Sequence, residues 1–164
     1  MKVLYRRVEG GDIEEILMLF NKLKIESAEV TFADVVNKRE IEEWLMNTNY
    51  YLYIAEVNKK IISIFRGVRG IAEKNHCILL TIATDPQYRS LGITKNLILY
   101  SLKDIKERER NIVLARAYVY NNNNKSLNTL MSCGFTVSGS VYQHHYDKKT
   151  GLYIDDIILH KILQ

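Results

Sequence analysis

The hydrophobic positions of the N-terminal part recur first at strand spacing and then at helical spacing. Residues 2–8 can form a first strand. A helix follows, which Asp12 could cap, and its hydrophobic residues fall on one face: Ile13, Ile16, Leu17, Phe20 and Leu23. A second helix is predicted over residues 38–46, with Ile41, Trp44 and Leu45 on its buried side. Residues 50–57 and 61–68 flank a polar segment at 58–60, which predicts a β-hairpin.

The segment 76–84 differs from these strands because both of its faces are apolar. One face carries Ile78, Leu80 and Ile82, and the other carries Cys77, Leu79 and Ala83. We therefore expect a central strand that is covered on both sides. A helix over residues 91–108 and a strand over 111–120 follow it. This order predicts two parallel neighbouring strands, with the helix crossing over one face of the sheet.

The C-terminal part predicts a short helix and a final antiparallel pair of strands. Residues 126–133 form the helix, which Gly134 can end in the left-handed conformation. Residues 135–142 and 152–163 are the predicted strands, joined by a polar loop over 144–151. The last strand could lie at a sheet edge and pair with another copy, so a homodimer is left open. The order of elements indicates a mixed α+β fold rather than a repeated alternation.

Composition limits the class of protein. The chain has 164 residues, is 47% hydrophobic and shows no repeat or linker, so we expect a single domain over residues 1–164. Its apolar runs are too short for a membrane span and it begins without a signal peptide, so we expect a cytoplasmic protein with no membrane partner. Cys77 and Cys133 lie in apolar segments, which favours buried reduced thiols over a disulfide or a metal site. The net charge of +4 is mild, and the basic residues of 103–110 are interleaved with acidic ones, which disfavours a nucleic-acid partner.

The most specific candidate chemistry lies in the loop between the central strand and the long helix, residues 84–94. This loop holds the only proline of the chain, and its main-chain N–H groups at the helix start can bind a phosphate. Gly92 lets the backbone approach such an anion, and the Arg89 guanidinium adds charge-assisted donors. A P-loop is excluded because no Gly-Lys-Ser/Thr follows the glycine, and a Rossmann fingerprint is excluded because only one glycine is present.

Two segments together resemble the GCN5-related N-acetyltransferase (GNAT) superfamily. Arg89-Ser-Leu-Gly92-Ile-Thr94 is similar to the Arg/Gln-x-x-Gly-x-Gly/Ala loop of that family, including a proline upstream. Residues 123–135, from Asn123 to Gly134-Phe135, are similar to its Asn-x-x-Ala/Ser helix. The resemblance is specific from about residue 78 to 161. It implies a mixed, mostly antiparallel sheet of about seven strands with a splayed parallel pair, flanked by about four helices, and acetyl-coenzyme A as co-substrate without a metal.

The resemblance also implies the residues that bind the coenzyme. The main chain of Ile82 and Thr84 should pair with the pantetheine arm, and Asn123 and Ser126 should contact the arm from the end of the next strand. The pyrophosphate should be surrounded by the loop and the first helical turn: Arg89, Ser90, Leu91, Gly92, Ile93, Thr94 and Lys95. The alternative is that Gly92 is only a loop glycine and Asn123 only a helix cap.

The chain departs from the family pattern at the catalytic positions. Leu130 stands where many members place a tyrosine that protonates the departing sulfur, and Tyr120 or a water could substitute for it. Thr94 replaces a glycine or alanine, so we expect its side chain to crowd the pyrophosphate and weaken binding. The predicted strand 76–84 has no glutamate, a common base in the family, and the catalytic base is left open.

Other titratable side chains could line the acceptor site. Glu26, Glu29 and Asp34 lie between the first two helices, a region that folds over the acceptor in the family. If one of them lines the pocket, it would favour a cationic amine. His144 and His145 lie in the predicted last loop, which can also border the acceptor. Asp155 and Asp156 interrupt an apolar strand, and Asp156 is either pocket-lining or structural because a buried carboxylate needs partners.

The sequence thus predicts an acetyl-coenzyme A-dependent N-acetyltransferase that acts on a primary amine of a small molecule or peptide. An amine that resembles lysine has a pKa near 10.4, so only about one molecule in a thousand is neutral at pH 7 and a base is needed. The alternative is an acyl-coenzyme A-binding domain with little or no transferase activity, which the loss of the tyrosine and the glutamate favours. A nucleic-acid binder is a third and weaker alternative.

Overall fold

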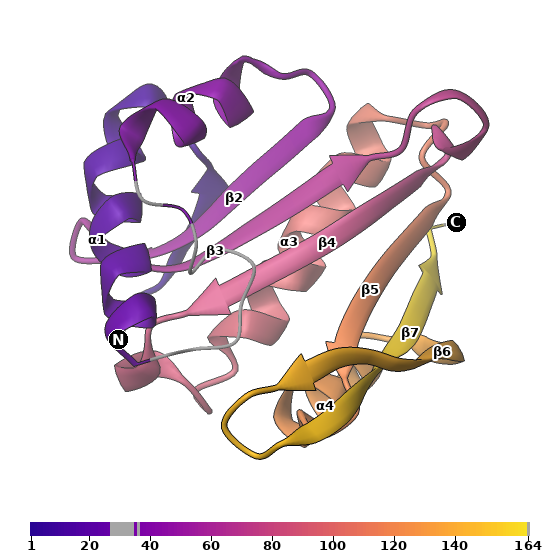
Figure 1. Cartoon of the computed structure of the whole chain (residues 1–164). Coiled ribbons are helices and arrows are strands. Elements are labelled where there is room, and N and C mark those ends of the chain that lie inside the picture. The colour runs from indigo at the N-terminus through magenta and orange to yellow at the C-terminus, as the bar shows by residue number, and fades with distance from the viewer. Residues whose placement is uncertain (27–34, 36, 164) are drawn as a thin grey trace.

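The computed structural model describes residues 1–26, 35 and 37–163, which form a central sheet with helices on both faces (Figure 1). The strands of the described residues are β1 (Leu4–Arg7), β2 (Tyr50–Val57), β3 (Lys60–Arg69), β4 (Cys77–Thr84), β5 (Leu114–Tyr120), β6 (Thr136–Asp147) and β7 (Leu152–Ile162). Their α-helices are α1 (Ile13–Ile25), α2 (Lys38–Met46), α3 (Ile93–Arg108) and α4 (Asn124–Ser132).

The strands form one sheet in the order β1-β2-β3-β4-β5-β7-β6. All neighbouring strands are antiparallel except β4 and β5, which are parallel and connected through α3. A parallel pair needs such a crossover, whereas the antiparallel pairs β2–β3 and β6–β7 are closed by short turns. The prediction of a mixed, mostly antiparallel sheet with a parallel pair is confirmed.

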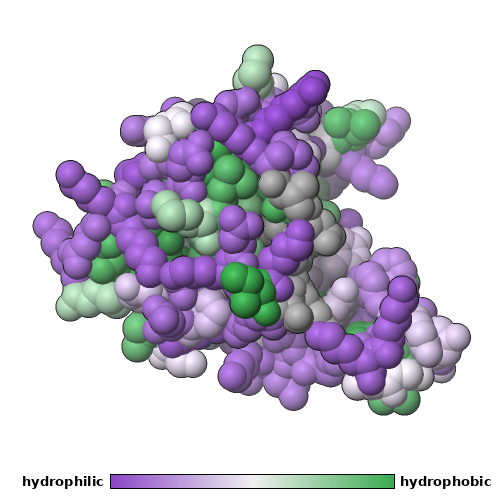
Figure 2. Space-filling view, turned by 60° about the vertical axis from the view of Figure 1, so that its left-hand side comes forward, coloured by the Kyte–Doolittle hydropathy of each residue, from purple (hydrophilic) through white to green (hydrophobic). Residues whose placement is uncertain are grey.

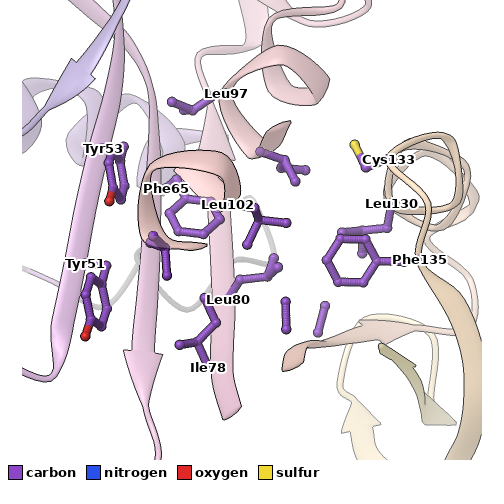
Figure 3. Packing of buried hydrophobic residues seen from close by; sticks show 14 of the residues in the cluster. Tyr51, Tyr53, Phe65, Ile78, Leu80, Leu97, Leu102, Leu130, Cys133 and Phe135 are labelled. Carbon is purple, nitrogen blue, oxygen red and sulfur yellow. The ribbon is translucent and has the colours of Figure 1, made fainter. Parts of the chain in front are cut away.

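One face of the sheet carries α3 and α4 and contains the larger part of the core. In α3, hydrophobic residues recur at helical spacing, so Leu97, Ile98, Leu102 and Ile105 are buried together. Figure 3 shows Leu102 of this helix beside Phe65 of the sheet. Full burial of a side chain such as Phe65 contributes about 1.5–3 kcal/mol. Because Ile93 in the first turn of α3 is buried in the same cluster, this packing also fixes the start of the helix.

The opposite face carries α1 and α2 over β2 and β3. Ile16, Phe20 and Leu23 of α1 pack with Ile41 of α2 and with Ile64 of β3. The outer surfaces of these helices are polar, and Figure 2 shows this side of the molecule as largely hydrophilic with separate hydrophobic side chains. The prediction of both helices is confirmed, and α2 has the predicted bounds.

The β2–β3 hairpin is also where the sequence predicts it. Asn58 and Lys59 both have left-handed backbone conformations, with φ of 49° and 64°. Two successive left-handed residues match the twist of a two-residue hairpin loop. The second strand therefore begins at Lys60, one residue earlier than predicted.

The prediction that residues 76–84 are covered on both sides is wrong for the first half of the strand. β4 is central in the sheet, and Ile78 and Leu80 are buried under α3. On the other face Leu79 is 41% exposed, whereas Ala83 is buried against the α1–α2 layer. The two N-terminal helices pack on the β2–β3 side of the sheet and reach only the end of β4.

The C-terminal hairpin differs from the sequence prediction in two ways. His144 and His145 belong to β6 rather than to a loop, because pairing resumes at His145↔Ile154 and continues to Asp147↔Leu152. The connecting turn is consequently short and ends at Gly151, which has a left-handed φ of 71°. The last strand, β7, lies between β5 and β6, so the predicted edge position is wrong, and β6 is the edge strand on this side of the sheet.

The two cysteines are free thiols, Cys133 buried and Cys77 half-buried. Burial raises the pKa of both thiol groups, which keeps them protonated at neutral pH. Among the described helices, none is both long enough and apolar enough to cross a membrane.

Asp85 fixes the turn that follows β4. Its side chain is 1% exposed and lies 3.0 Å from Lys22 Nζ of α1 and 3.6 Å from Lys60 Nζ of β3. The carboxylate also accepts the N–H of Gln87, which caps the 3-10 turn Pro86–Tyr88. Burial alone would raise the pKa of the Asp85 carboxyl, but the hydrogen bonds from Lys22 and Gln87 outweigh burial and the pKa lies below its ordinary value.

We predict that Asp85→Asn lowers the free energy of unfolding at pH 7 by about 1–3 kcal/mol, because asparagine keeps the cap but not the charge. A carboxyl group whose pKa is depressed by folding stabilises the fold above its unfolded pKa, near 4, and this stabilisation is lost as the pH falls through the folded pKa. Urea unfolding of wild type and variant should therefore converge in strong acid. The exposed Glu73→Gln serves as control, and a difference independent of pH would contradict the prediction.

Candidate functional site

The parallel strands β4 and β5 pair over three positions and then separate. Their register runs from Cys77↔Leu114 to Leu79↔Arg116. Figure 1 shows the carboxyl-terminal ends of the two strands diverging. We call these diverging ends, residues 80–84 of β4 and 117–120 of β5, the splay.

The main chain of β4 presents alternate residues to the splay. Asp85 N–H donates to Ile62 O at 2.8 Å, and Cys77 O accepts from Gly70 N–H at 2.9 Å, so odd-numbered residues face β3. Strand geometry then directs the N–H and C=O groups of even-numbered residues toward the splay. Among them are Ile82 and Thr84, whose main chain the resemblance implies to pair with the pantetheine arm.

The other side of the splay follows the same alternation. Leu163 N–H donates to Val113 O and Asn121 N–H donates to Asp155 O, so odd-numbered residues of this segment face β7. The main-chain groups of Tyr118 and the N–H of Tyr120 therefore face the splay, whereas Tyr120 O accepts the N–H of Asn123 at 2.9 Å. An extended chain lying between β4 and β5 would find hydrogen-bonding groups on both sides.

The start of α3 presents a run of N–H donors beside the splay. Gly92 is the N-cap residue, with a left-handed φ of 75° and no side chain capping the helix. The first helical acceptor is Gly92 O, which accepts from Asn96 N–H at 3.0 Å. Within the described part of the chain, no acceptor contacts the N–H groups of residues 90–95. Six consecutive amides are thus unpaired within the described residues, and those of the first turn of α3 lie at the positive end of its dipole, which is the arrangement that binds a phosphate.

A polar groove of about 290 Å³ lies next to these amides. Its lining comes from the loop and the first turn of α3 and from one face of α4: Ser90, Gly92, Thr94, Lys95, Asn128, Thr129 and Ser132. The Ile93 side chain is 2% exposed and packs in the core, so only its main chain can reach a ligand here, whereas Leu91 is exposed. The groove extends the anion site toward α4.

Thr94 is tied to the sheet by a chain of hydroxyl groups. Thr94 Oγ1 lies 2.7 Å from Thr84 Oγ1, which lies 2.8 Å from Ser63 Oγ. Ser63 donates its own proton to Ala83 O at 2.9 Å. Because each hydroxyl has one proton, Thr84 donates to Ser63 and Thr94 donates to Thr84. The Thr94 hydroxyl is therefore directed toward β4.

Arg89 is engaged within the turn. Its two terminal nitrogens each donate to a Glu26 carboxylate oxygen at 2.8 Å, and Nε donates to Thr84 O at 3.2 Å. Its main-chain N–H donates to Pro86 O at 3.3 Å. The guanidinium thus joins the end of α1 to the loop, and the predicted contact between this side chain and a pyrophosphate stays a prediction.

Asn123 and Leu130 both have structural contacts in α4. Asn123 caps the helix, since its side-chain oxygen accepts the N–H of Ser126 at 3.1 Å. This is the role that the alternative interpretation gave it, and a contact between Asn123 or Ser126 and the coenzyme arm stays a prediction. Leu130 is 4% exposed and packs with Cys133 and Phe135 (Figure 3), so no proton donor stands at this position.

The structure brings together three candidates that the sequence named separately. Asp156 is 5% exposed, and its Oδ2 lies 2.7 Å from His144 Nδ1 and 3.1 Å from His145 Nε2. The His145 ring lies 4.7 Å from the ring of Tyr120, at the end of β5. Asp156 is therefore not an isolated charge in an apolar strand but the centre of a polar cluster that borders the splay.

One face of β4 and β5, where the two strands begin to separate, carries residues that the sequence analysis did not name as candidates for the site. Leu79 and Arg116 are register partners, and Tyr118 follows on the same face of β5. Leu79 is 41% and Tyr118 43% exposed, and Arg116 Nε is buried without a hydrogen-bond partner within the described residues. The alternation of polar and small residues in residues 114–120 was a signal for an open strand face. The candidates Glu29 and Asp34 lie outside the described residues.

Comparisons with known proteins match this geometry. The family model described as Acetyltransferase (GNAT) family matches residues 14–135. An acetyltransferase of the GNAT family from Streptococcus pneumoniae has a TM-score of 0.87 at 19% identity, covering 99% of this chain and 100% of that chain. A putative acetyltransferase from Salmonella typhimurium with its cofactor acetyl-CoA gives 0.85 at 16% identity, covering 99% and 94%.

A third structure, ribosomal-protein-alanine N-acetyltransferase from Brucella melitensis, gives a TM-score of 0.83 at 21% identity, covering 97% of this chain and 99% of that chain. No curated protein matches the chain in sequence. At these identities the structural neighbours establish the fold, and the family model, which covers most of the chain, establishes the relationship. The chain belongs to the GNAT family of acetyltransferases.

Proposed function

We propose that the chain transfers the acetyl group of acetyl-coenzyme A to a primary amine of a small molecule or a peptide, by direct attack on the thioester. The observation that carries this proposal is the run of amides of residues 90–95, which have no acceptor within the described residues, at one end of the splay. A pyrophosphate and an extended amide arm together need such donors followed by two open strand edges.

Each part of the coenzyme has a counterpart in this arrangement. The pyrophosphate lies against the N–H groups from Ser90 to Lys95, where the exposed Lys95 ammonium adds charge. The pantetheine arm lies in the splay and pairs with the main chain of Ile82 and Thr84. The amide of Asn123 and the hydroxyl of Ser126 border the arm from the α4 side.

The splay also suits the reaction itself. When an amine attacks the thioester carbonyl, negative charge develops on the oxygen, and a main-chain N–H of β4 that faces the splay can stabilise it. The carbon–nitrogen bond forms, the carbon–sulfur bond breaks, and coenzyme A leaves as a thiolate. A thiol has a pKa near 8.5, so the thiolate is a tolerable leaving group even with Leu130 in place of a tyrosine acid.

We place this reaction in the cytoplasm and assign it to the chain as one catalytic domain. Both cysteines are free and have thiol groups that burial keeps protonated, which suits a reducing compartment. The acceptor is an amine that is mostly protonated at neutral pH, so the site must remove a proton before attack.

Two measurements test the proposed reaction. Calorimetry should detect saturable binding of acetyl-coenzyme A, and a thiol-release assay should detect turnover with at least one member of a panel of alkyl amines, polyamines and peptides with free N-termini. Binding without turnover on any amine would favour the acyl-coenzyme A-binding alternative. Absence of binding would overturn the proposal.

We predict that Gly92→Ala weakens coenzyme A binding about tenfold, the cost of losing roughly one charge-assisted hydrogen bond. A Cβ at this position meets no neighbouring atom, so the effect comes from the left-handed φ, whose relaxation turns the adjacent N–H groups. Gly151→Ala is a matched control because its φ is 71° and its Cβ space is also open. Both variants should lose about 1 kcal/mol of stability, since a left-handed alanine is strained, and equal affinities would contradict the prediction.

We predict that Thr94→Ala and Thr94→Val both lower the free energy of unfolding by about 1 kcal/mol, because each removes the hydrogen bond to Thr84. Only Thr94→Ala should tighten coenzyme A binding, by a few-fold, because it alone shortens the side chain that lines the groove. Thermal unfolding and calorimetry on the same samples check both effects. If alanine weakens binding, the Thr94 side chain contacts the ligand favourably and the expected crowding is wrong.

A further inference from the structure

The β6 strand contains an irregularity that turns two successive histidines to one side. Pairing with β7 jumps from Val141↔Asp156 to His145↔Ile154, so β6 has two more residues than β7 in this interval. Gln143 is left-handed, with a φ of 48°, and its N–H donates to Asp155 Oδ1 at 2.7 Å. In a regular strand, neighbouring residues point to opposite faces. Here the bulge allows His144 and His145 to reach the same carboxylate.

The contacts of this cluster define the protonation of its rings. Both histidines approach the same oxygen of Asp156, at 2.7 Å and 3.1 Å, and the two rings lie 4.5 Å apart. A carboxylate oxygen accepts but does not donate, so each ring presents an N–H to Asp156. In the neutral form, the remaining nitrogens, His144 Nε2 and His145 Nδ1, then carry free lone pairs.

We propose that His145, oriented by Asp156, is the base that removes the proton from the acceptor amine. This inference rests on the proposed acetyl transfer and names the group that the reaction requires. His145 is the better placed of the two rings because it contacts the ring of Tyr120, the last residue of the β5 edge of the splay. The side chain of His144 is 50% exposed and that of His145 39%. His144 and Asp156 are positioning residues.

The other described carboxylates near the splay are already engaged. Asp85 is paired with two lysines, and Glu26 is paired with Arg89. β4 contains no carboxylate along its described length, from Cys77 to Thr84. The cluster of His144, His145 and Asp156 therefore supplies the proton acceptor that β4 lacks.

The proton balance is complete without a further reactant. His145 Nδ1 takes one proton from the ammonium form of the acceptor, and the neutral amine attacks the thioester carbonyl. The nitrogen loses its second proton as the tetrahedral intermediate collapses, and the departing thiolate accepts a proton from the imidazolium or from this nitrogen. The sum is an acetylated amine, free coenzyme A thiol and one proton released to solvent.

Histidine resonances provide a test that needs no acceptor. The chain has four histidines, so their ring signals can be assigned by single substitutions and followed by NMR. Saturation with acetyl-coenzyme A should shift the ring signals of His145 and leave those of His76, which precedes the opposite end of β4, unchanged. If calorimetry shows binding while the His145 signals do not move, the inference is overturned and the coenzyme site is not.

Kinetics with the best amine of the panel tests the chemical role. His145→Gln should lower kcat/KM about a hundredfold or more while leaving coenzyme A affinity unchanged, as expected for loss of a general base. Activity with hydroxylamine, which is largely unprotonated at neutral pH, should fall far less. The control His76→Gln should leave both reactions unchanged. Equal losses with amine and hydroxylamine would overturn the inference, because His145 would then act in binding rather than in proton transfer.

The pH profile separates the positioning residues from the base. The wild-type kcat/KM should rise with pH along a limb that disappears in His145→Gln. The titratable groups around this ring are His144 of β6, Tyr120 of β5, and Asp155 and Asp156 of β7. Asp156→Asn should lower kcat with little change in KM, because the hydrogen bond that orients His145 loses its charge, and His144→Gln should retain the pH-dependent limb.

Two outcomes distinguish failure of the proposed acetyl transfer from failure of the proposed role of His145. Absence of turnover with every amine, with acetyl-coenzyme A still bound, overturns the proposed function and with it the role of His145 in catalysis. Turnover that is lost with a chelator and restored by zinc overturns the inference alone, because the cluster would then hold an ion rather than a proton.

Discussion

The separation of β4 from β5 after Leu79 is the constraint on which the rest of the site depends. A sheet normally satisfies its main-chain donors and acceptors with neighbouring strands, and unpaired groups away from water are costly. Here the pairing covers three positions and then stops, while residues 90–95, which lead into α3 and form its start, have six amides with no acceptor within the described residues. These features are adjacent because α3 is the crossover between the two strands. A ligand with an anion at one end and amides along its length supplies what both features lack.

Ion pairs and hydrogen bonds around the turn after β4 fix the position of the loop that precedes α3. Asp85 binds Lys22 of α1 and Lys60 of β3, and Arg89 joins Glu26 at the end of α1 to the carbonyl of the last residue of β4. The side chains of Asp85 and Arg89 therefore make the hydrogen bonds of this turn. The amides of residues 90–95 are left without an acceptor among the described residues. The same contacts connect α1, in the helix layer over β2 and β3, to the loop between β4 and α3. Burial of the Asp85 carboxylate makes this connection sensitive to acid.

Local patterns predicted most of this fold. Helical spacing gave α2 with its bounds, and the polar segment after residue 57 gave the hairpin, because these signals depend only on neighbouring residues. The order strand, loop, helix, strand gave the parallel pair. The bounds of β6 were not predictable, because the bulge at Gln143 depends on the hydrogen bond from its N–H to Asp155 across the hairpin. The edge position of β6 was not predictable either, because it depends on the order of strands in the sheet. The residues 84–94 could be singled out because they form a contiguous motif, whereas the convergence of His144 and His145 on Asp156 depends on register between two strands.

For the proposed acetyl transfer to an amine, a base matters more than an acid. The thiolate of coenzyme A leaves readily near neutral pH, so the loss of the acid at position 130 costs little rate. Leu130 instead packs in the core. An alkyl ammonium is a poor nucleophile until it loses a proton, and no change in the leaving group compensates for that. A hairpin that packs against β5 can supply the missing base from the opposite side of the splay, provided that its register is irregular. The left-handed Gln143 is then not a defect of β6 but the feature that directs two imidazoles to one buried carboxylate.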